Sequence, residues 1–153
     1  MTEKKSLFEK LVHKCFEATI IFDIFRKILH QNFSIEKKVL KKELDLTKKT
    51  LDFGCGSGPY AVIFPQEVYI GMDVDERNIA FAQKRYKKKF IVEKSGSLKA
   101  IPKVTQLFAI DVFHHLPNVM VKKYVDEFYQ VLEEGGKILI LDHYPVKEQT
   151  KIM

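Results

Sequence analysis

Three glycines alternate with other residues directly after an aspartate, in the stretch LDFGCGSG at residues 51–58. The chain has only 7 glycines in 153 residues, so this concentration indicates a loop whose backbone a ligand approaches closely. The pattern differs from the G-x-G-x-x-G loop of dinucleotide-binding proteins, because Pro59 stands where that loop needs its last glycine or alanine. A phosphate-binding P-loop is excluded as well, since no Gly-Lys-Ser/Thr follows.

Carboxylates end four of the short apolar runs of the chain, and each run is typical of a β-strand. These residues are Asp52, Asp73, Asp111 and Asp142. Ligands of an open parallel sheet lie at the carboxyl ends of the strands, so we expect the four carboxylates at that edge. Each aspartate could instead cap the turn or helix that follows it. Gathered carboxylates repel one another, and a positively charged ligand would relieve the repulsion.

The elements that must position these residues alternate along the chain from residue 48 onwards. Five apolar runs predict strands: KKTLDF, EVYIGMD, KFIVEKS, TQLFAID and GKILILD. DERNIAFAQKRYKK predicts a helix with Asp75 as its N-cap, and NVMVKKYVDEFYQVLEEGG predicts a second helix with Gly135 as its stop. This order predicts an α/β fold with a mostly parallel sheet of about five strands and helices on both faces. Residues 6–43 have helical periodicity, and Ser34 is the candidate N-cap of the last helix there.

Three stretches resemble the class I S-adenosylmethionine-dependent methyltransferases, in their small-molecule, type 11/12-like branch. LDFGCGSG resembles the first motif of that family, and YIGMDVDERNIAFAQK resembles the second, in which an acid ends the second strand. LFAIDVFHHLPNVMVKKYVDEFYQVLEEGGKILILDH resembles the region from the fourth strand to the fifth. The resemblance covers roughly residues 45–142. It implies a three-layer Rossmann-like methyltransferase fold, S-adenosyl-L-methionine as cofactor and a small-molecule substrate.

The resemblance also implies a role for individual residues. Asp52 would hold the cofactor's ammonium group, directly or through water, and Asp73 would accept both ribose hydroxyls. Val74 would pack on adenine, while Asp111 or the backbone of Ile110 would face the methionine end. The acid that the family often carries after the third strand aligns with Ser97. The complete expected cofactor-binding set is Asp52, Phe53, Gly54, Cys55, Gly56, Gly58, Asp73, Val74, Ser97, Leu98, Ile110 and Asp111.

Two histidines follow the fourth strand, where a general base would help a phenol, alcohol or carbon acid to accept a methyl group. We therefore expect His114, His115 and Asp111 to be the catalytic residues. Alternatively, one histidine stabilises the turn before the helix and the other is exposed. No metal site is expected, because His114, His115 and His143 lack metal-ligand spacing.

The charge and composition of the chain restrict which binding partners and which cellular location we expect. The net charge is +6, but only three of the 26 basic residues are arginine, the residue that bidentate base and phosphate contacts favour. A nucleic-acid partner is therefore not expected. No signal peptide opens the chain, and no apolar run reaches the roughly 20 residues of a membrane span. The two cysteines lie far apart in sequence, so we expect a cytoplasmic protein.

Two functions remain open: an active methyltransferase, or a cofactor-binding module that needs a partner chain to complete its active site. We expect residues 1–44 to form a helical lid and residues 45–153 to form the cofactor-binding domain, in one compact unit. The family sheet continues past its fifth strand into an antiparallel pair, whereas HYPVKEQTKIM follows here. We expect the edge of KILILD to be covered by a second copy, a partner chain or the N-terminal helices, with the homodimer as first choice.

Overall fold

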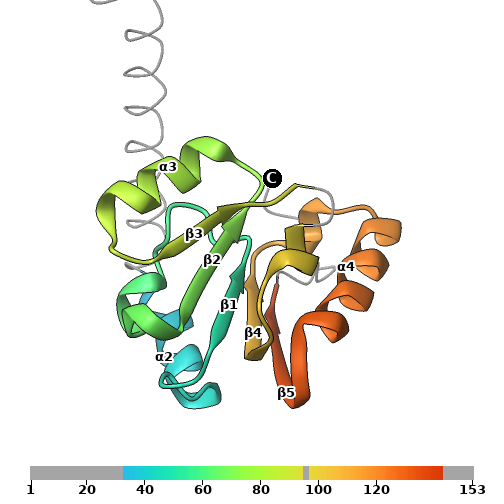
Figure 1. The fold of residues 1–153 in the computed structure, drawn as a ribbon, viewed down its shortest axis with the longest axis horizontal. Helices are drawn as coiled ribbons and strands as arrows, with labels where there is room; N and C mark the ends of the chain where they lie inside the picture. Colours follow the sequence, from blue (N-terminus) through green and yellow to red (C-terminus); the bar gives the residue numbers. More distant parts are fainter. Residues whose placement is uncertain (1–32, 95–96, 143–153) are drawn as a thin grey trace, which may run out of the picture.

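A computed structural model describes residues 33–94 and 97–142 of the chain, apart from the side chain of Ser97. Five strands form one parallel sheet in the order β3-β2-β1-β4-β5 (Figure 1). Their bounds are Thr50–Phe53 for β1, Tyr69–Asp73 for β2, Lys89–Val92 for β3, Val104–Ile110 for β4 and Leu132–Leu141 for β5. The five predicted strands and the α/β fold are confirmed, and all carboxyl ends lie at one edge. The predicted helices before residue 33 lie outside the described residues.

The helices of the described ranges are α2 (Ser34–Glu43), α3 (Glu76–Arg85) and α4 (Asn118–Val131). Short 3-10 turns complete the connections: η2 (Ala61–Ile63), η3 (Gln66–Val68), η4 (Ser97–Ala100) and η5 (Phe113–His115). The cap of α3 is confirmed, since Oδ1 of Asp75 accepts a hydrogen bond from the Arg77 amide at 2.9 Å. The cap predicted at Ser34 is wrong: Ser34 is already helical, and Phe33 precedes it with a φ of 58° and no side-chain cap.

The helix α4 ends at Val131, so the stop predicted at Gly135 is also wrong. The next residue, Leu132, already pairs with Val104 of β4 and begins β5. The pairing then shifts, and Gln106 lies opposite Lys137. Gly135 therefore lies in an irregularity of the strand, with a φ of 72°. Pairing with a distant strand, rather than a local helix stop, ends this helix.

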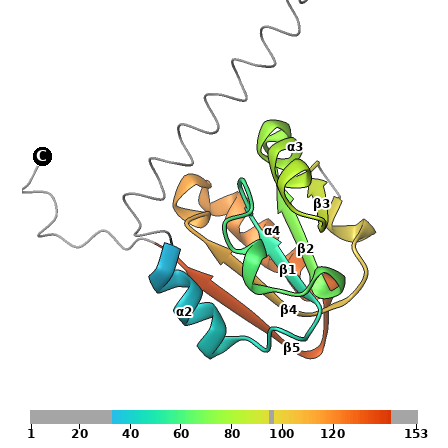
Figure 2. The same cartoon turned by 90° about the vertical axis from the view of Figure 1, so that its left-hand side faces the viewer.

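Helices cover both faces of the sheet, which gives the three layers of a Rossmann-like fold (Figure 2). On one face, Leu40 of α2 and Ile79 of α3 belong to the same buried cluster as Tyr69 and Phe108. On the other face, Phe128 of α4 belongs to the cluster that buries Leu51, Phe53 and Met72, which also includes residues of η4. Because side chains alternate along a strand, Asp52 points away from Leu51 and Phe53, toward the face that carries α2 and α3.

Candidate functional site

The glycine loop leaves β1 at Gly54, whose φ of +77° favours glycine. A Cβ there would lie 2.3 Å from Cγ2 of Val112, so the backbone of β1 and the segment after β4 approach too closely for a side chain. The amides of Gly54 and Cys55 both donate to the carbonyl of Met72, at 2.8 and 2.9 Å. The loop is thus fixed to the end of β2 by backbone hydrogen bonds.

Asp73, at the end of β2, joins the glycine loop to the start of α3. Its Oδ2 accepts a hydrogen bond from the Gly56 amide at 2.8 Å. Its Oδ1 accepts one from the Asp75 amide, also at 2.8 Å. The two bonds hold the carboxylate in one orientation at the carboxyl edge of the sheet, next to the loop.

A cavity of about 240 Å³ opens at this edge, beside the glycine loop. Its lining residues are Phe53, Gly54, Gly56, Met72, Asp73, Val74, Asn78, Glu93, Ile110, Asp111, Val112, His115, Leu116 and Tyr124. Eight of the residues expected at the site are among them: Phe53, Gly54, Gly56, Asp73, Val74, Ile110, Asp111 and His115. Residues that follow β1, β2, β3 and β4 in the sequence therefore meet around one cavity, at the carboxyl ends of adjacent strands.

Asp52 is not part of the cavity lining. The side chain is 1% exposed, and its Oδ2 accepts a hydrogen bond from the Tyr69 hydroxyl at 2.5 Å. Burial raises the pKa of Asp52 to about 8, and the Asp73 charge adds to the rise while the Tyr69 hydrogen bond opposes it. The structure thus places this carboxyl behind the loop, outside the cavity lining.

Three other residues of the expected cofactor set also lie away from the cavity lining. Cys55 is buried, and burial raises the pKa of its thiol. Leu98 is buried in the core on the α4 side of the sheet. At Gly58 an added Cβ would meet the rings of Tyr86 and Phe90 at 3.1 and 3.2 Å, so the absence of a side chain here allows the two rings to pack against the loop. The side chain of Ser97 lies outside the described part of the chain.

Glu93 and Tyr124 line the cavity although the sequence reasoning did not place them there. Glu93 directly follows β3, and its amide donates to the carbonyl of Asp73 at 2.7 Å. Glu93 is a carboxylate at the end of a strand, as the four aspartates are. The same criterion would therefore have identified Glu93 from the sequence. Burial, and after it the neighbouring Glu93 carboxylate, raise the pKa of the Tyr124 phenol. Tyr124 is buried in the cluster on the α4 side of the sheet, and it also contributes to the cavity lining.

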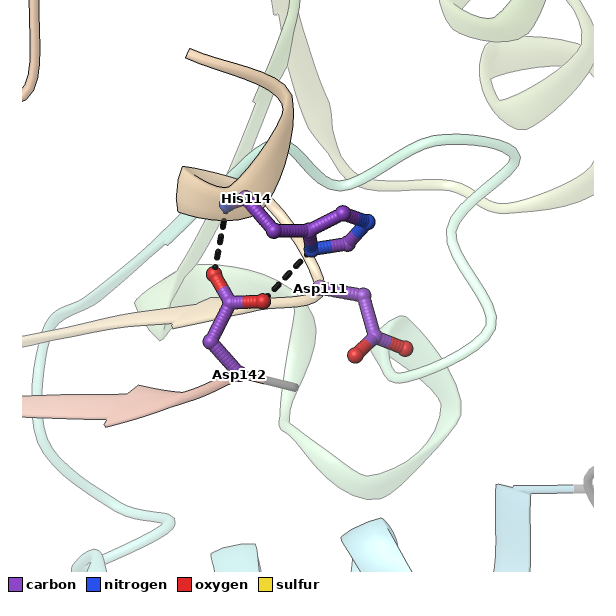
Figure 3. A group of neighbouring side chains, drawn as sticks. All are labelled: Asp111, His114 and Asp142. Carbon is purple, nitrogen blue, oxygen red and sulfur yellow. Dashed lines mark hydrogen bonds and ion pairs between the residues drawn. The ribbon is translucent and has the colours of Figure 1, made fainter. Parts of the chain in front are cut away.

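Asp111, His114 and Asp142 meet beyond the ends of β4 and β5 (Figure 3). Oδ2 of Asp142 accepts hydrogen bonds from the amides of Phe113 and His114, at 2.6 and 3.1 Å, and thereby holds η5. Its Oδ1 lies 2.5 Å from Nδ1 of His114. Asp111 has a φ of 56°, a left-handed conformation that is uncommon for residues other than glycine. One ligand-type atom of each residue lies within 4.8 Å of the others.

His114 and His115 have different surroundings. His115 lines the cavity, whereas His114 does not. The two rings are nevertheless adjacent, with centroids 3.8 Å apart. His114 stabilises the turn before α4 through its hydrogen bond with Asp142, which is the alternative role that the sequence left open for one histidine. The His115 ring beside it lines the cavity.

Comparison with known proteins identifies a matching family. The sequence model described as "Methyltransferase domain" matches residues 51–140. Among curated proteins, none matches the chain. The solved structures that resemble it include the YcgJ protein of Bacillus subtilis, with 23% identity, a TM-score of 0.60, and coverage of 79% of this chain and 54% of that one.

Two further solved structures share the fold. A SAM-dependent methyltransferase of Archaeoglobus fulgidus is 19% identical, with a TM-score of 0.59, and the match covers 73% of this chain and 53% of that one. The magnesium protoporphyrin IX methyltransferase of Synechocystis PCC 6803, solved with bound SAM, is 17% identical, with a TM-score of 0.56 and coverage of 86% and 62%. The chain thus spans little more than half the length of the first solved structures that it matches. Within the described ranges, no helix has both the length and the apolar character that crossing a membrane requires.

Proposed function

The chain belongs to the methyltransferase domain family of class I S-adenosylmethionine-dependent enzymes, and on that premise we propose that it transfers a methyl group from S-adenosylmethionine to a small molecule. The observation that carries this proposal is the charge of the cavity. Asp73, Glu93 and Asp111 all line it, in a protein of net charge +6. Three carboxylates beside a glycine loop favour a cationic ligand, and S-adenosylmethionine has both a sulfonium and an ammonium group.

The residues of the cavity fit this cofactor. The backbone at Gly54 and Gly56 lines the cavity without side chains, which permits close contact with the methionine part. Asp73 would accept hydrogen bonds from the ribose hydroxyls, and the exposed Val74 would pack on the adenine ring. Asp111 and Ile110 would face the methionine end. Asp52 would support the loop from behind through its bond with Tyr69, because its carboxyl is buried.

Glu93 replaces Ser97 in our proposal as the acceptor for the adenine amino group. Glu93 lines the cavity from the end of β3, and its carboxylate accepts hydrogen bonds more strongly than a serine hydroxyl would. Tyr124 lines the same cavity, and the Glu93 carboxylate contributes to the raised pKa of its phenol, after burial.

When bound, S-adenosylmethionine supplies an electrophilic methyl group, so the chain mainly has to align the acceptor, exclude water and receive a proton. The apolar lining residues Val112 and Leu116 exclude water beside Asp111. His115 lines the cavity and His114 lies next to it, so both remain candidates for receiving the proton.

The transfer itself is tested with cofactor that carries a tritium-labelled methyl group and a low-molecular-mass metabolite extract as the source of acceptors. We expect label in small molecules with the unmodified chain and none with Asp73→Ala. Label that appears only in protein or nucleic acid would contradict the small-molecule proposal. Cofactor binding without any transfer would favour the alternative, a binding module completed by a partner chain.

The outer edge of β5 is our proposed site of association. β5 is the last strand of the sheet, and among the described residues no strand pairs with its outer edge. Ile140, in that strand, is 44% exposed. An uncovered strand edge favours pairing, and a second copy would cover it about a two-fold axis. Light scattering at micromolar concentration is expected to show a dimer. A monomer whose β5 amides exchange quickly with solvent would contradict this.

We also propose two features that the sequence predicts, a helical lid and a cytoplasmic location. The first is a lid formed by residues 1–44. Within that range, α2 packs on the sheet through Leu40, and residues 1–32 lie outside the described residues. The second is a cytoplasmic location, which is supported by the two cysteines being far apart in sequence.

A further inference from the structure

Asp52 comes two residues before the first glycine of the loop, but its buried carboxyl does not line the cavity. We propose that Asp52 nevertheless determines specificity for ligand charge. It holds a proton in the free chain, releases that proton when the sulfonium cofactor binds, and keeps it when the thioether product S-adenosylhomocysteine binds. The inference rests on the proposed cofactor site and adds a dependence on ligand charge to it.

The backbone of β1 places Asp52 directly behind the cavity. The next two residues, Phe53 and Gly54, both line the cavity. Within the sheet, Asp52 lies opposite Gly71 of β2 and Phe108 of β4, and neither neighbour has a charge. Because the Asp52 side chain is closed off from water, a charge on its carboxyl is screened only weakly from charges in the cavity.

The Asp52 carboxyl has a neutral hydrogen-bond donor but no cation beside it. In the part of the chain that the structure describes, its side-chain hydrogen bond comes from the Tyr69 hydroxyl, and no lysine or arginine pairs with it. The amino group of Lys88 lies 5.9 Å from the centre of the Tyr69 ring and donates to the Phe64 carbonyl instead. The titratable groups around the Asp52–Tyr69 pair and in the same buried cluster are Cys55, Tyr60, Asp73, Tyr86 and Lys88.

Burial distinguishes Asp52 from the carboxyls that line the cavity. Asp73, Glu93 and Asp111 are partly exposed, so water stabilises their charges. Burial raises the pKa of Asp52, the Tyr69 hydrogen bond lowers it, and the Asp73 charge raises it again. Asp52 is therefore the carboxyl whose ionisation depends most on the charge that a ligand brings.

A positive charge in the cavity stabilises the carboxylate of Asp52 and not the protonated acid. The ionised chain therefore binds a sulfonium ligand more tightly, and by reciprocity binding lowers the pKa of Asp52. The O–H bond of the carboxyl breaks, its electron pair stays on oxygen, and the proton passes to water. S-adenosylhomocysteine lacks the sulfonium charge, so Asp52 stays protonated when the product binds.

The release of a proton makes the affinity depend on pH. Affinity for S-adenosylmethionine should rise with pH, by up to about tenfold per unit, and level off above the free-chain pKa of about 8. Asp52 should give no such rise for S-adenosylhomocysteine. The amino group of the ligands also titrates, near pH 8, but it occurs in both and cancels in the comparison.

The released protons are counted by calorimetric titration of the full chain at pH 7, in two buffers of different ionisation enthalpy. We expect S-adenosylmethionine to release up to one proton more than S-adenosylhomocysteine does. Asp52→Asn, which cannot ionise, should abolish this difference and the rise in affinity with pH. Asp126→Asn, at an exposed position of α4, is the matched control and should keep both. Equal proton release with the two ligands in the unmodified chain would overturn the inference.

Infrared difference spectra of the unmodified chain keep the inference testable if Asp52→Asn fails to fold. The C=O band of a protonated, buried carboxyl should disappear when S-adenosylmethionine is added and persist with S-adenosylhomocysteine. Tyr69→Phe removes the hydrogen bond that favours the carboxylate, so it should move the rise in affinity to higher pH. A band that persists with S-adenosylmethionine bound would overturn this inference alone, whereas absence of binding of both ligands would overturn the cofactor proposal with it.

Discussion

The carboxylate of Asp73 accepts a hydrogen bond of 2.8 Å from the backbone amide of Gly56, so the acid that ends β2 is attached to the loop that follows β1. The two residues come from different segments of the family pattern, and both line the cavity. One side chain therefore shapes the loop and offers a charged acceptor to a ligand.

Replacement of this carboxylate gives the first prediction. Asp73→Ala should weaken the binding of S-adenosylmethionine far more than His114→Ala does. The change removes charge-assisted hydrogen bonds worth about 1.5–3 kcal/mol each, and it also releases Gly56. Calorimetric titration of both variants measures the difference, and Asp126→Ala controls for the loss of a negative charge. Equal, small effects of the first two changes would show that the ribose site lies elsewhere.

The proposed contact between Glu93 and the adenine amino group is tested by changing the ligand as well as the protein. Glu93→Ala should weaken binding of S-adenosylhomocysteine by about 1.5–3 kcal/mol, the usual contribution of a hydrogen bond to a charged group. It should have little effect on S-inosylhomocysteine, whose ring carries an oxygen in place of the amino group. Affinities of both ligands are compared in both proteins. The same loss for both ligands would argue against a contact between Glu93 and the amino group.

Gly54 and Gly135 form a matched pair for a test of loop geometry. Both have a positive φ, +77° and +72°, but an added Cβ would lie 2.3 Å from Val112 at Gly54 and would meet nothing within 4 Å at Gly135. Gly135→Ala should cost about 1–2 kcal/mol of unfolding free energy, from backbone strain alone. Gly54→Ala should cost about 1–3 kcal/mol more because of overpacking. Urea unfolding measures both, and equal losses would contradict the close approach at Gly54.

Asp52 gives a prediction for the dependence of stability on pH. Burial raises its pKa to about 8 in the folded chain, from an ordinary value of 3.8, so the folded chain keeps a proton that the unfolded chain loses. The Asp52 contribution is therefore fully present below pH 4 and falls by up to about 1.4 kcal/mol per pH unit up to pH 8. Asp52→Asn should remove this part of the decline, measured as unfolding free energy from pH 4 to 9. A difference between the two proteins that does not change with pH would contradict the buried carboxyl.

Local signals in the sequence were sufficient for α3 and for the strands, apart from the start of β5 at Leu132. The apolar runs are short and regularly spaced, and Asp75 caps α3 through an amide two residues away. The end of α4 could not be predicted in this way, because it depends on the pairing of Leu132 with Val104, 28 residues earlier. Strand pairing over such a separation is not visible in the residues next to Gly135.

The candidate site shows the same division between local and distant determinants. The glycine loop and Asp73 follow from local motifs, and both line the cavity. The burial of Asp52 depends on which face of β1 it occupies and on a hydroxyl 17 residues away, on Tyr69. The hydrogen bonds between Asp142 and η5 join residues 28 and 29 positions apart. Only the folded chain brings these groups together.

The central claim is that the cavity beside the glycine loop binds S-adenosylmethionine, and calorimetric titration of the purified chain tests it most directly. We predict saturable binding of S-adenosylmethionine and S-adenosylhomocysteine with one site per chain, loss of that binding in Asp73→Ala, and no binding of NAD. Binding of NAD but of neither sulfur-containing ligand would contradict the account.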